Sequence, residues 1–200
     1  ASDVYKRQVP FLTGYQVNAS EEQKHLDILF THDLHSHLNS FQTIVDGTQQ
    51  ETGGFARLKT LINEHEKENT DTLILDGGDF SMGTLIQTVY DTEAAELRML
   101  GYLGCDVTTL GNHEFDYRSS GLSEMLISAV KNKEEDASLT LPMLLSANID
   151  WEKNKDQEDQ KLREAMELYG AKPYTILERN GVKIGIYGVL GQEAEDFAPE

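Results

Sequence analysis

The sequence is poor in basic residues, contains no long hydrophobic run and has a single cysteine. Its 17 Lys and Arg residues stand against 35 Asp and Glu residues, which gives a formal net charge of −18. Nucleic-acid backbones are bound by clustered Lys and Arg side chains, so a chain this acidic, without a basic tract, is predicted not to bind nucleic-acid polymers. No apolar stretch reaches the roughly 18 residues of a membrane-spanning helix, so no span is predicted.

Because Cys105 is the only cysteine, no intrachain disulfide can form, and a zinc cage built from several cysteines is excluded. The thiol follows a glycine and has no basic neighbour, so we expect a buried structural residue rather than a nucleophile. Six histidines and many aspartates leave metal binding through nitrogen and oxygen atoms open. The 200 residues, 38% of them hydrophobic, suffice for one domain, or for one domain and part of another.

The two ends of the chain look unlike a natural domain boundary. Asp3 to Gln8 read codon for codon like the end of a common transposon-based sequencing adapter, so we interpret residues 1–8 as an artefact rather than a polar tail. Residues 9–24 are polar and aperiodic and are predicted to form a linker. Residues 25–200 carry the pattern of a folded domain that stops just after an apparent core strand, so we interpret it as truncated.

Short apolar runs alternate with amphipathic helical patterns along this domain. Strands are predicted at residues 26–30, 72–75, 107–110 and 143–146. Helices are predicted where apolar residues recur every three or four positions: Phe55, Leu58, Leu61 and Ile62 after Gly53-Gly54, then Ala94 to Leu103, then Leu122 to Ala129. Residues 34–52 are expected to form a loop, and residues 151–167 a loop or surface helix. The alternation predicts an α/β fold with a parallel sheet.

A late hairpin is predicted to add an antiparallel element to this sheet. Asn180-Gly181, a strong hairpin turn signal, separates the apolar segments 174–178 and 182–189.

Polar segments follow the first three predicted strands. Ligands of open α/β sheets bind at the carboxyl ends of the strands, so these segments, distant in sequence, are expected to converge. After the first strand, Asp33 and His35 could point at one cation. After the second strand, Asp79 ends the turn Asp76-Gly77-Gly78-Asp79, and its two carboxylate oxygens could bridge two cations.

A further histidine, His37, leaves a second interpretation open. Asp33-Leu34-His35-Ser36-His37 resembles the His-x-His opening of the polymerase-and-histidinol-phosphatase superfamily and of amidohydrolases, which are barrel folds with metal clusters. In that interpretation His37 would be a metal ligand. Otherwise His37 contacts substrate or solvent.

The string Gly111-Asn112-His113-Glu114-Phe115-Asp116 after the third strand is the most specific of the three. Asn112 offers a neutral carbonyl oxygen to a divalent cation. His113 can face the same cleft, and Asp116 can hold its ring in one tautomer. A helix N-terminus capped by Asn or Asp would explain part of this string but not all of it.

Asp-x-His, Gly-Asp and Gly-Asn-His-Glu, in this order after successive strands, resemble the calcineurin-like metallophosphoesterases. Gly53-Gly54 before Ala56-Arg57, Ser146 to Ile149, and Lys172-Pro173-Tyr174 look like the 5′-nucleotidase and UDP-sugar hydrolase branch. The resemblance covers about residues 26–190. It implies that residues 25–200 are the N-terminal portion of a catalytic domain, a four-layer α-β-β-α sandwich with a mixed sheet.

The resemblance implies dinuclear metal-dependent hydrolysis of phosphoric esters, with a small phosphorylated substrate that in this branch is a nucleotide. Asp33 and His35 would hold the first of two divalent metal ions, Asp79 would bridge both, and Asn112 would hold the second. His113 would be the catalytic histidine, oriented by Asp116. Mn, Zn, Fe or Mg would all fit this ligation. A noncatalytic metal-binding scaffold that keeps the motifs is an alternative from another class.

The sequence departs from the family pattern in two ways. His32 stands where the branch often has Asn, which is expected to matter little. The family's later histidine ligands, including a Gly-His-x-His motif, are absent from the 200 residues, so we expect this chain alone to be inactive. The resemblance further implies a separate C-terminal domain that chooses the substrate, and an extracellular or cell-surface location.

Overall fold

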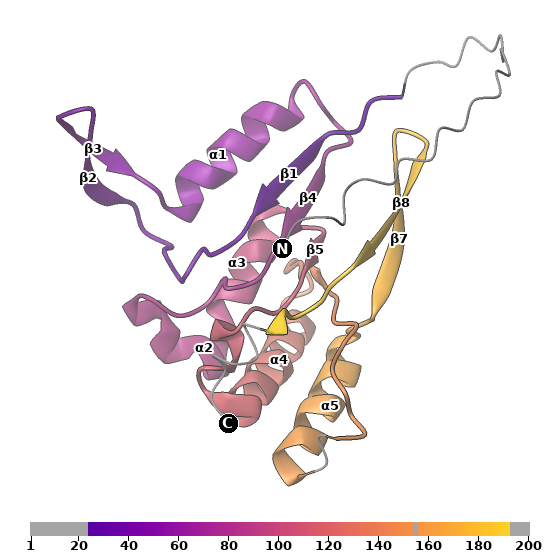
Figure 1. Cartoon of the computed structure of the whole chain (residues 1–200). Coiled ribbons are helices and arrows are strands. Elements are labelled where there is room, and N and C mark those ends of the chain that lie inside the picture. The colour runs from indigo at the N-terminus through magenta and orange to yellow at the C-terminus, as the bar shows by residue number, and fades with distance from the viewer. Residues whose placement is uncertain (1–23, 154–155, 193–200) are drawn as a thin grey trace, which may run out of the picture.

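The computed structural model describes residues 24–153 and 156–192 (Figure 1). The strands are β1 (Ile28–Thr31), β2 (Phe41–Val45), β3 (Thr48–Thr52), β4 (Leu73–Asp76), β5 (Val107–Thr108), β6 (Met143–Leu144), β7 (Tyr174–Arg179) and β8 (Val182–Tyr187). The helices are α1 (Phe55–Glu66), α2 (Tyr90–Glu93), α3 (Ala95–Leu103), α4 (Arg118–Glu135) and α5 (Gln157–Tyr169), with 3₁₀ turns η1 (Leu85–Val89) and η2 (His113–Phe115). The predicted artefact at residues 1–8 lies outside the described residues, as does nearly all of the predicted linker.

The central sheet has the strand order β1-β4-β5-β6, and each neighbouring pair is parallel. Ile28 pairs with Leu73, Leu75 with Val107, and Val107 with Met143. The predicted α/β fold is therefore confirmed, although β5 and β6 are each two residues long where four were expected. Because all four strands point the same way, the segments that follow β1, β4 and β5 emerge at one edge of the sheet.

The helices form one layer over this sheet. Helix α1 contacts α3, and α4 contacts both α2 and α5. Their apolar faces and one face of the sheet share a buried core that includes Phe55, Ile62, Ile74, Leu97, Leu100, Leu122, Leu126, Leu144 and Leu162. None of the described helices has the length and hydrophobicity that a bilayer-spanning helix requires. The described residues thus supply one helical layer and one sheet layer of the predicted sandwich.

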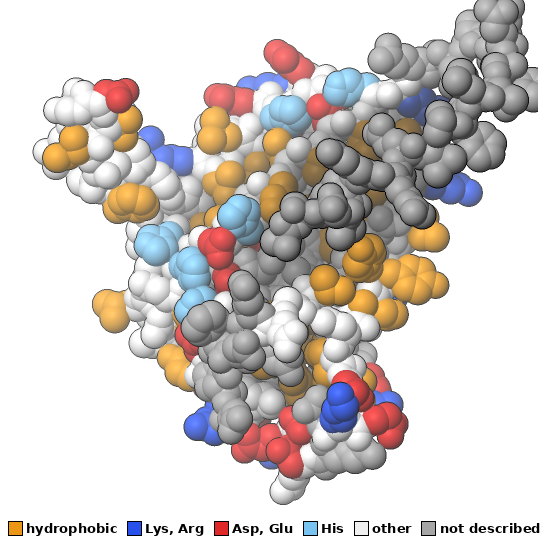
Figure 2. Space-filling model, in the orientation of Figure 1, with side chains coloured by type: hydrophobic (Ala, Val, Ile, Leu, Met, Phe, Trp, Pro, Cys, Tyr) orange, Lys and Arg blue, Asp and Glu red, His pale blue; other side chains and the backbone are white. Residues whose placement is uncertain are grey.

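On the opposite side of the central sheet, the side chains of the edge strand β1 are exposed, whereas Leu73 of β4 and Val107 of β5 are buried. Along β1, Leu29 packs against the core, whereas Ile28 and Phe30 are exposed. Tyr174 and Ile176 of β7 are also exposed, and Figure 2 shows hydrophobic side chains gathered over the β7–β8 hairpin. Apolar surface is therefore exposed along β1 and on the β7–β8 hairpin.

The β7–β8 hairpin forms around Asn180-Gly181 as predicted, but it is a two-stranded sheet of its own rather than part of the central sheet. Its two turn residues have φ angles of 49° and 68°, in the left-handed region that such a turn requires. The strands pair antiparallel from Tyr174↔Tyr187 to Arg179↔Val182. A parallel bridge between Leu145 and Lys172 joins the start of this segment to the chain after β6.

The predicted loop at residues 34–52 was wrong in its second half. Residues 41–52 form the antiparallel hairpin β2–β3, which projects from the body of the molecule (Figure 1). Asp46-Gly47, with φ angles of 50° and 76°, makes the turn, and Asp-Gly is itself a hairpin signal. The strands were missed because they are rich in Gln and Thr and nearly all their residues are exposed, so no alternation of burial marks them.

Residues 151–167 were predicted to form a loop or a surface helix, and the helix is confirmed. Residues 157–169 form a helix, begun by Asp156, whose carboxylate accepts the backbone N–H groups of Glu158 and Asp159, each at 2.8 Å. Leu61, assigned to the apolar face of α1, is 63% exposed. The helix presents only part of that face to α3 and the sheet.

Candidate metal centre

Backbone hydrogen bonds join the segment after β1 to the segment after β4. The N–H of Asp33 donates to the Gly78 carbonyl at 3.1 Å, and the N–H of His35 donates to the Asp79 carbonyl at 3.0 Å. The N–H of Ser36 continues the series, donating to the Phe80 carbonyl at 2.9 Å. The two segments, which lie far apart in the sequence, are therefore held as one unit.

Several non-glycine residues of this unit adopt left-handed backbone conformations. The φ angles are 52° at Asp33, 45° at His35, 54° at Ser36 and 51° at Asp79. Such a conformation costs about 1–3 kcal/mol at each position and persists only where the surroundings impose it. The backbone hydrogen bonds between the two segments supply that constraint.

Glycine lets the segment after β5 approach the same unit. A Cβ atom at Gly111 would lie 2.2 Å from Asp79 Oδ1, and one at Gly78 would lie 2.6 Å from the Gly111 nitrogen. Gly78 also has a φ angle of 90°. Side chains at these two positions would push the loops apart, which accounts for the glycines in both motifs.

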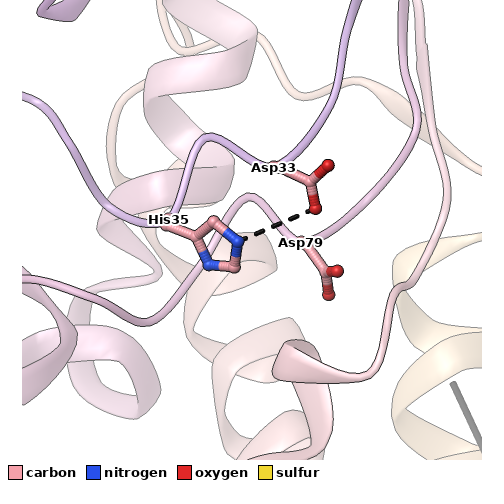
Figure 3. A group of neighbouring side chains, drawn as sticks. All are labelled: Asp33, His35 and Asp79. Atoms are coloured by element: carbon pink, nitrogen blue, oxygen red, sulfur yellow. Dashed lines mark ion pairs between the residues drawn. The ribbon is translucent and has the colours of Figure 1, made fainter.

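Asp33, His35 and Asp79 lie close together, and Figure 3 shows the ion pair between Asp33 and His35, with Asp79 beside them. One ligand atom from each lies within 4.8 Å of the others, and His35 Nε2 is 3.7 Å from Asp33 Oδ1. His35 Nδ1 lies 3.2 Å from the Met82 carbonyl, to which it donates, which leaves Nε2 as the ring nitrogen that faces the carboxylates. Two carboxylates and one neutral imidazole suit Mn, Zn or Fe, so the residues present fit a divalent cation.

His113 lies beside this group. Its backbone N–H donates to Asp79 Oδ1 at 3.0 Å, and its ring meets the His35 ring edge-on at a centroid distance of 4.8 Å. Its Nδ1 is 3.0 Å from Asp116 Oδ2. Burial acts to lower the pKa of His113, but the hydrogen bond and charge of Asp116 outweigh it, so the pKa is raised. The ring is therefore fixed by Asp116, with Nε2 as its remaining nitrogen.

Asn112 is half-buried in the turn between β5 and η2, where its backbone carbonyl accepts the Phe115 N–H at 3.0 Å. It immediately precedes His113 in this turn, and its predicted role as a metal ligand stays a prediction. His32 hydrogen-bonds to Asp33, and this bond is the main reason that the pKa of Asp33 is lowered.

His37 is exposed and lies outside the three-residue group. Its Nδ1 donates to the Leu34 carbonyl at 3.3 Å. The central sheet is open among the described residues, with β1 at one end and β6 at the other, and His37 takes no part in the donor group, so this part of the chain gives no support to the barrel alternative that would have made His37 a ligand.

Glu114 is the residue whose role the sequence analysis missed. Its fully buried carboxylate accepts four hydrogen bonds, from the N–H of Asp79 (2.9 Å) and Gly111 (2.7 Å) and from the N–H and Oγ of Ser81 (3.1 and 2.8 Å). Burial raises its pKa to about 7. Its place in the Gly-Asn-His-Glu string was the available signal, but a pattern of residue types does not show which acid turns inward.

The geometry agrees with comparisons to known proteins. A family model described as Calcineurin-like phosphoesterase matches residues 26–188. The 5′-nucleotidase of Rattus norvegicus is 37% identical over 84% of this chain and 26% of its own length. The solved 5′-nucleotidase precursor of Thermus thermophilus has a TM-score of 0.66 at 25% identity, over 85% of this chain and 29% of that one. The Haemophilus influenzae NAD nucleotidase has a TM-score of 0.63 at 29% identity, over 84% and 26%.

The chain spans between a quarter and a third of the length of these relatives. Within that part, the three motifs that follow β1, β4 and β5 meet at one edge of the parallel sheet, as their positions after successive strands predicted. Because the family model matches most of the sequence and the fold is shared with the solved 5′-nucleotidases, the chain belongs to the calcineurin-like phosphoesterase family.

Proposed function

We propose that the whole protein hydrolyses phosphoric monoesters of nucleotides with two divalent metal ions. The observation that carries the proposal is the meeting of Asp33, His35 and Asp79, with His113 bonded to Asp79 on one side and Asp116 on the other. Relatives named 5′-nucleotidase and NAD nucleotidase support the nucleotide substrate. An extracellular or cell-surface location stays a prediction.

Each side chain has a distinct role in this proposal. Asp33 and His35 would hold the first cation, Asp79 would contribute to both, and Asn112 would hold the second. The chemistry that the cations supply when bound is activation of water and stabilisation of phosphate charge. His113, with Nδ1 bonded to Asp116, carries the catalytic proton at Nε2 and gives it to the leaving oxygen. The hydrogen bond and charge of Asp116 act to raise the pKa of His113, which favours this protonated form.

The test uses the whole protein with a nucleoside 5′-monophosphate as substrate. Chelation should abolish phosphate release, and added Mn²⁺ should restore it. His113→Ala should lower turnover by about 10²–10⁴-fold, the usual contribution of a general acid. Its metal content, measured by elemental analysis, should equal that of the native protein. Chelator-resistant turnover would contradict the metal mechanism, and loss of metal from His113→Ala would contradict the role given to His113.

The alternative of a noncatalytic scaffold predicts a different result in the same experiment. A scaffold would bind Mn²⁺ through Asp33, His35 and Asp79 but release no phosphate from any monoester. Turnover by the whole protein, lost in His113→Ala without loss of metal, would exclude it.

The 200-residue chain alone should be inactive. Three side chains serve the first cation, but only Asp79 and Asn112 are assigned to the second, and catalytic sites usually offer about three protein ligands. The chain should therefore retain at most one metal ion per molecule after gel filtration, with negligible turnover. Two retained ions, or turnover equal to that of the whole protein, would contradict this ligand assignment.

A further inference from the structure

A buried acid behind the candidate metal centre has no role in the proposed chemistry. Glu96 lies in the first turn of α3 and is fully buried, as is Ser36. Ser36 Oγ donates to Glu96 Oε1 at 2.6 Å. The other carboxylate oxygen, Oε2, is buried and has no hydrogen-bond partner among the described residues. Among the described residues, the only hydrogen bond to this carboxylate is therefore the one that Oε1 accepts from Ser36.

Ser36 is the residue that follows His35, and its polar atoms are all engaged. Its N–H donates to the Phe80 carbonyl, while its own carbonyl accepts Thr84 Oγ1 at 2.7 Å and the Leu38 N–H at 2.8 Å. Its hydroxyl adds the bond to Glu96. Both His35 and Ser36 are in the left-handed backbone region, which few surroundings would impose. A shift of Ser36 would therefore be transmitted directly to the backbone of His35.

A glutamate at position 96 is expected to stabilise the fold less than an apolar residue would. The neighbouring inward positions of α3 carry Leu97 and Leu100, and burial of a carboxylate beside them is unfavourable unless it is fully hydrogen-bonded. The N-terminal turn of a helix reduces this penalty, because the helix dipole favours a negative charge there. An apolar residue would fill the same place without the penalty but could not accept the Ser36 hydroxyl.

We propose that Glu96 is a positioning residue that, through Ser36, holds His35 in the orientation a divalent cation requires. The inference rests on the proposed function in one respect: it takes Asp33, His35 and Asp79 as metal ligands. It goes further in assigning part of the metal affinity to a side chain outside the three motifs. Partners that orient metal ligands typically contribute about 10–100-fold to affinity.

The test measures Mn²⁺ affinity by calorimetry on the metal-free whole protein, with thermal unfolding measured alongside. Glu96→Leu should weaken the tightest Mn²⁺ site about tenfold or more. Glu96→Gln should stay within about threefold of the native protein, because its amide carbonyl still accepts the Ser36 hydroxyl. Leu103→Ala, a buried change in the same helix, is the control: it should lower the unfolding temperature without weakening Mn²⁺ binding.

Ser36→Ala supplies an independent arm if Glu96→Leu folds poorly. It should weaken Mn²⁺ binding as Glu96→Leu does, and the double variant should lose little more than either single one, because both remove the same bond. Native affinity in Ser36→Ala and Glu96→Leu, or an equal loss in Leu103→Ala, would overturn the inference while leaving the proposed function intact. A native protein without Mn²⁺ affinity would overturn both.

Discussion

Acidic side chains stabilise the loops at both ends of the parallel sheet, but they form different interactions at each end. At the carboxyl end, the buried carboxylates of Glu114 and Asp76 accept backbone N–H groups, and Asp76 also accepts the Thr108 hydroxyl at 2.8 Å. At the amino end, Asp106 and Asp71 each accept a backbone N–H group as well, but there they also form ion pairs with Arg179, at 2.6 Å and 3.7 Å. These ion pairs attach the β7–β8 hairpin to the segments before β4 and β5.

The interactions at the carboxyl end fix the positions of the site loops, whereas those at the amino end only attach the β7–β8 hairpin to the sheet. A buried carboxylate is costly to desolvate, but every donor it accepts is fixed in position, and Glu114 fixes the loops that carry Asp79 and His113. Partly exposed ion pairs such as those of Arg179 are cheap to form and weak, since solvent and salt screen them. The end of the sheet with the candidate site is the end with the costly interactions.

The largest effect is expected for a change within the donor group itself. Asp79→Asn removes the carboxylate assigned to both cations and should lower Mn²⁺ affinity and monoester turnover of the whole protein by more than about 100-fold, beyond the range for residues that only orient ligands. His37→Ala, in the neighbouring loop, should change both by less than about threefold. Equal losses in the two variants, measured by calorimetry and phosphate release, would contradict the assigned roles.

Glu114→Leu tests the buried carboxylate at the same end. It leaves four donors without an acceptor, each worth about 1–3 kcal/mol when buried and unpaired. Urea unfolding at pH 7 should show a loss of about 3–5 kcal/mol in the free energy of unfolding. Glu124→Leu, an exposed change on α4, should stay within about 0.5 kcal/mol. A small loss for Glu114→Leu would mean that the loops hold without it.

The pH dependence of stability sharpens the same contrast. Burial raises the pKa of Glu114 from 4.5 to about 7, so the folded protein binds this proton more tightly than the unfolded chain does. The resulting stabilisation is complete below pH 4.5 and is lost as the pH rises through 7. With both proteins metal-free, the free energy of unfolding of the native protein, relative to that of Glu114→Gln, should therefore fall by about 3 kcal/mol as the pH rises through this window. A relative free energy of unfolding that rises with pH would contradict it.

The smallest effect is expected at the amino end. Arg179→Met removes the ion pairs with Asp71 and Asp106 and should cost about 1 kcal/mol at low salt, and less in about 1 M NaCl. Arg163→Met, which removes an exposed pair with Glu167 on α5, serves as the reference and should cost about 0.3–0.5 kcal/mol. A salt-independent loss for Arg179→Met larger than that for Glu114→Leu would reverse the comparison of the two ends.

The sequence was informative wherever a local pattern has one structural outcome. Asn180-Gly181 predicted its hairpin, and the apolar runs predicted β1 and β4 because the strands of a parallel sheet are nearly continuously hydrophobic, although only β4 is buried on both faces. Convergence of Asp33, Asp79 and His113 followed from their positions after successive parallel strands.

The orientation of individual acids was not predictable in this way. Glu96 and Glu114 are buried only because of the residues that pack around them. The chain has 35 Asp and Glu residues, and nothing in the sequence distinguishes these two from the acids that lie in solvent. Hairpin β2–β3 was missed for the opposite reason: its strands pair without burying a face, so hydrophobic periodicity does not reveal them.

The parallel topology also determines when the candidate site can form during folding. His35 and Met82 are 47 positions apart, and Asp79 and His113 are 34 apart, so the donor group assembles only after two long crossovers have closed. No preformed site exists in the unfolded chain, and a cation is expected to bind late. Added Mn²⁺ should therefore slow unfolding of the protein while leaving its folding rate nearly unchanged.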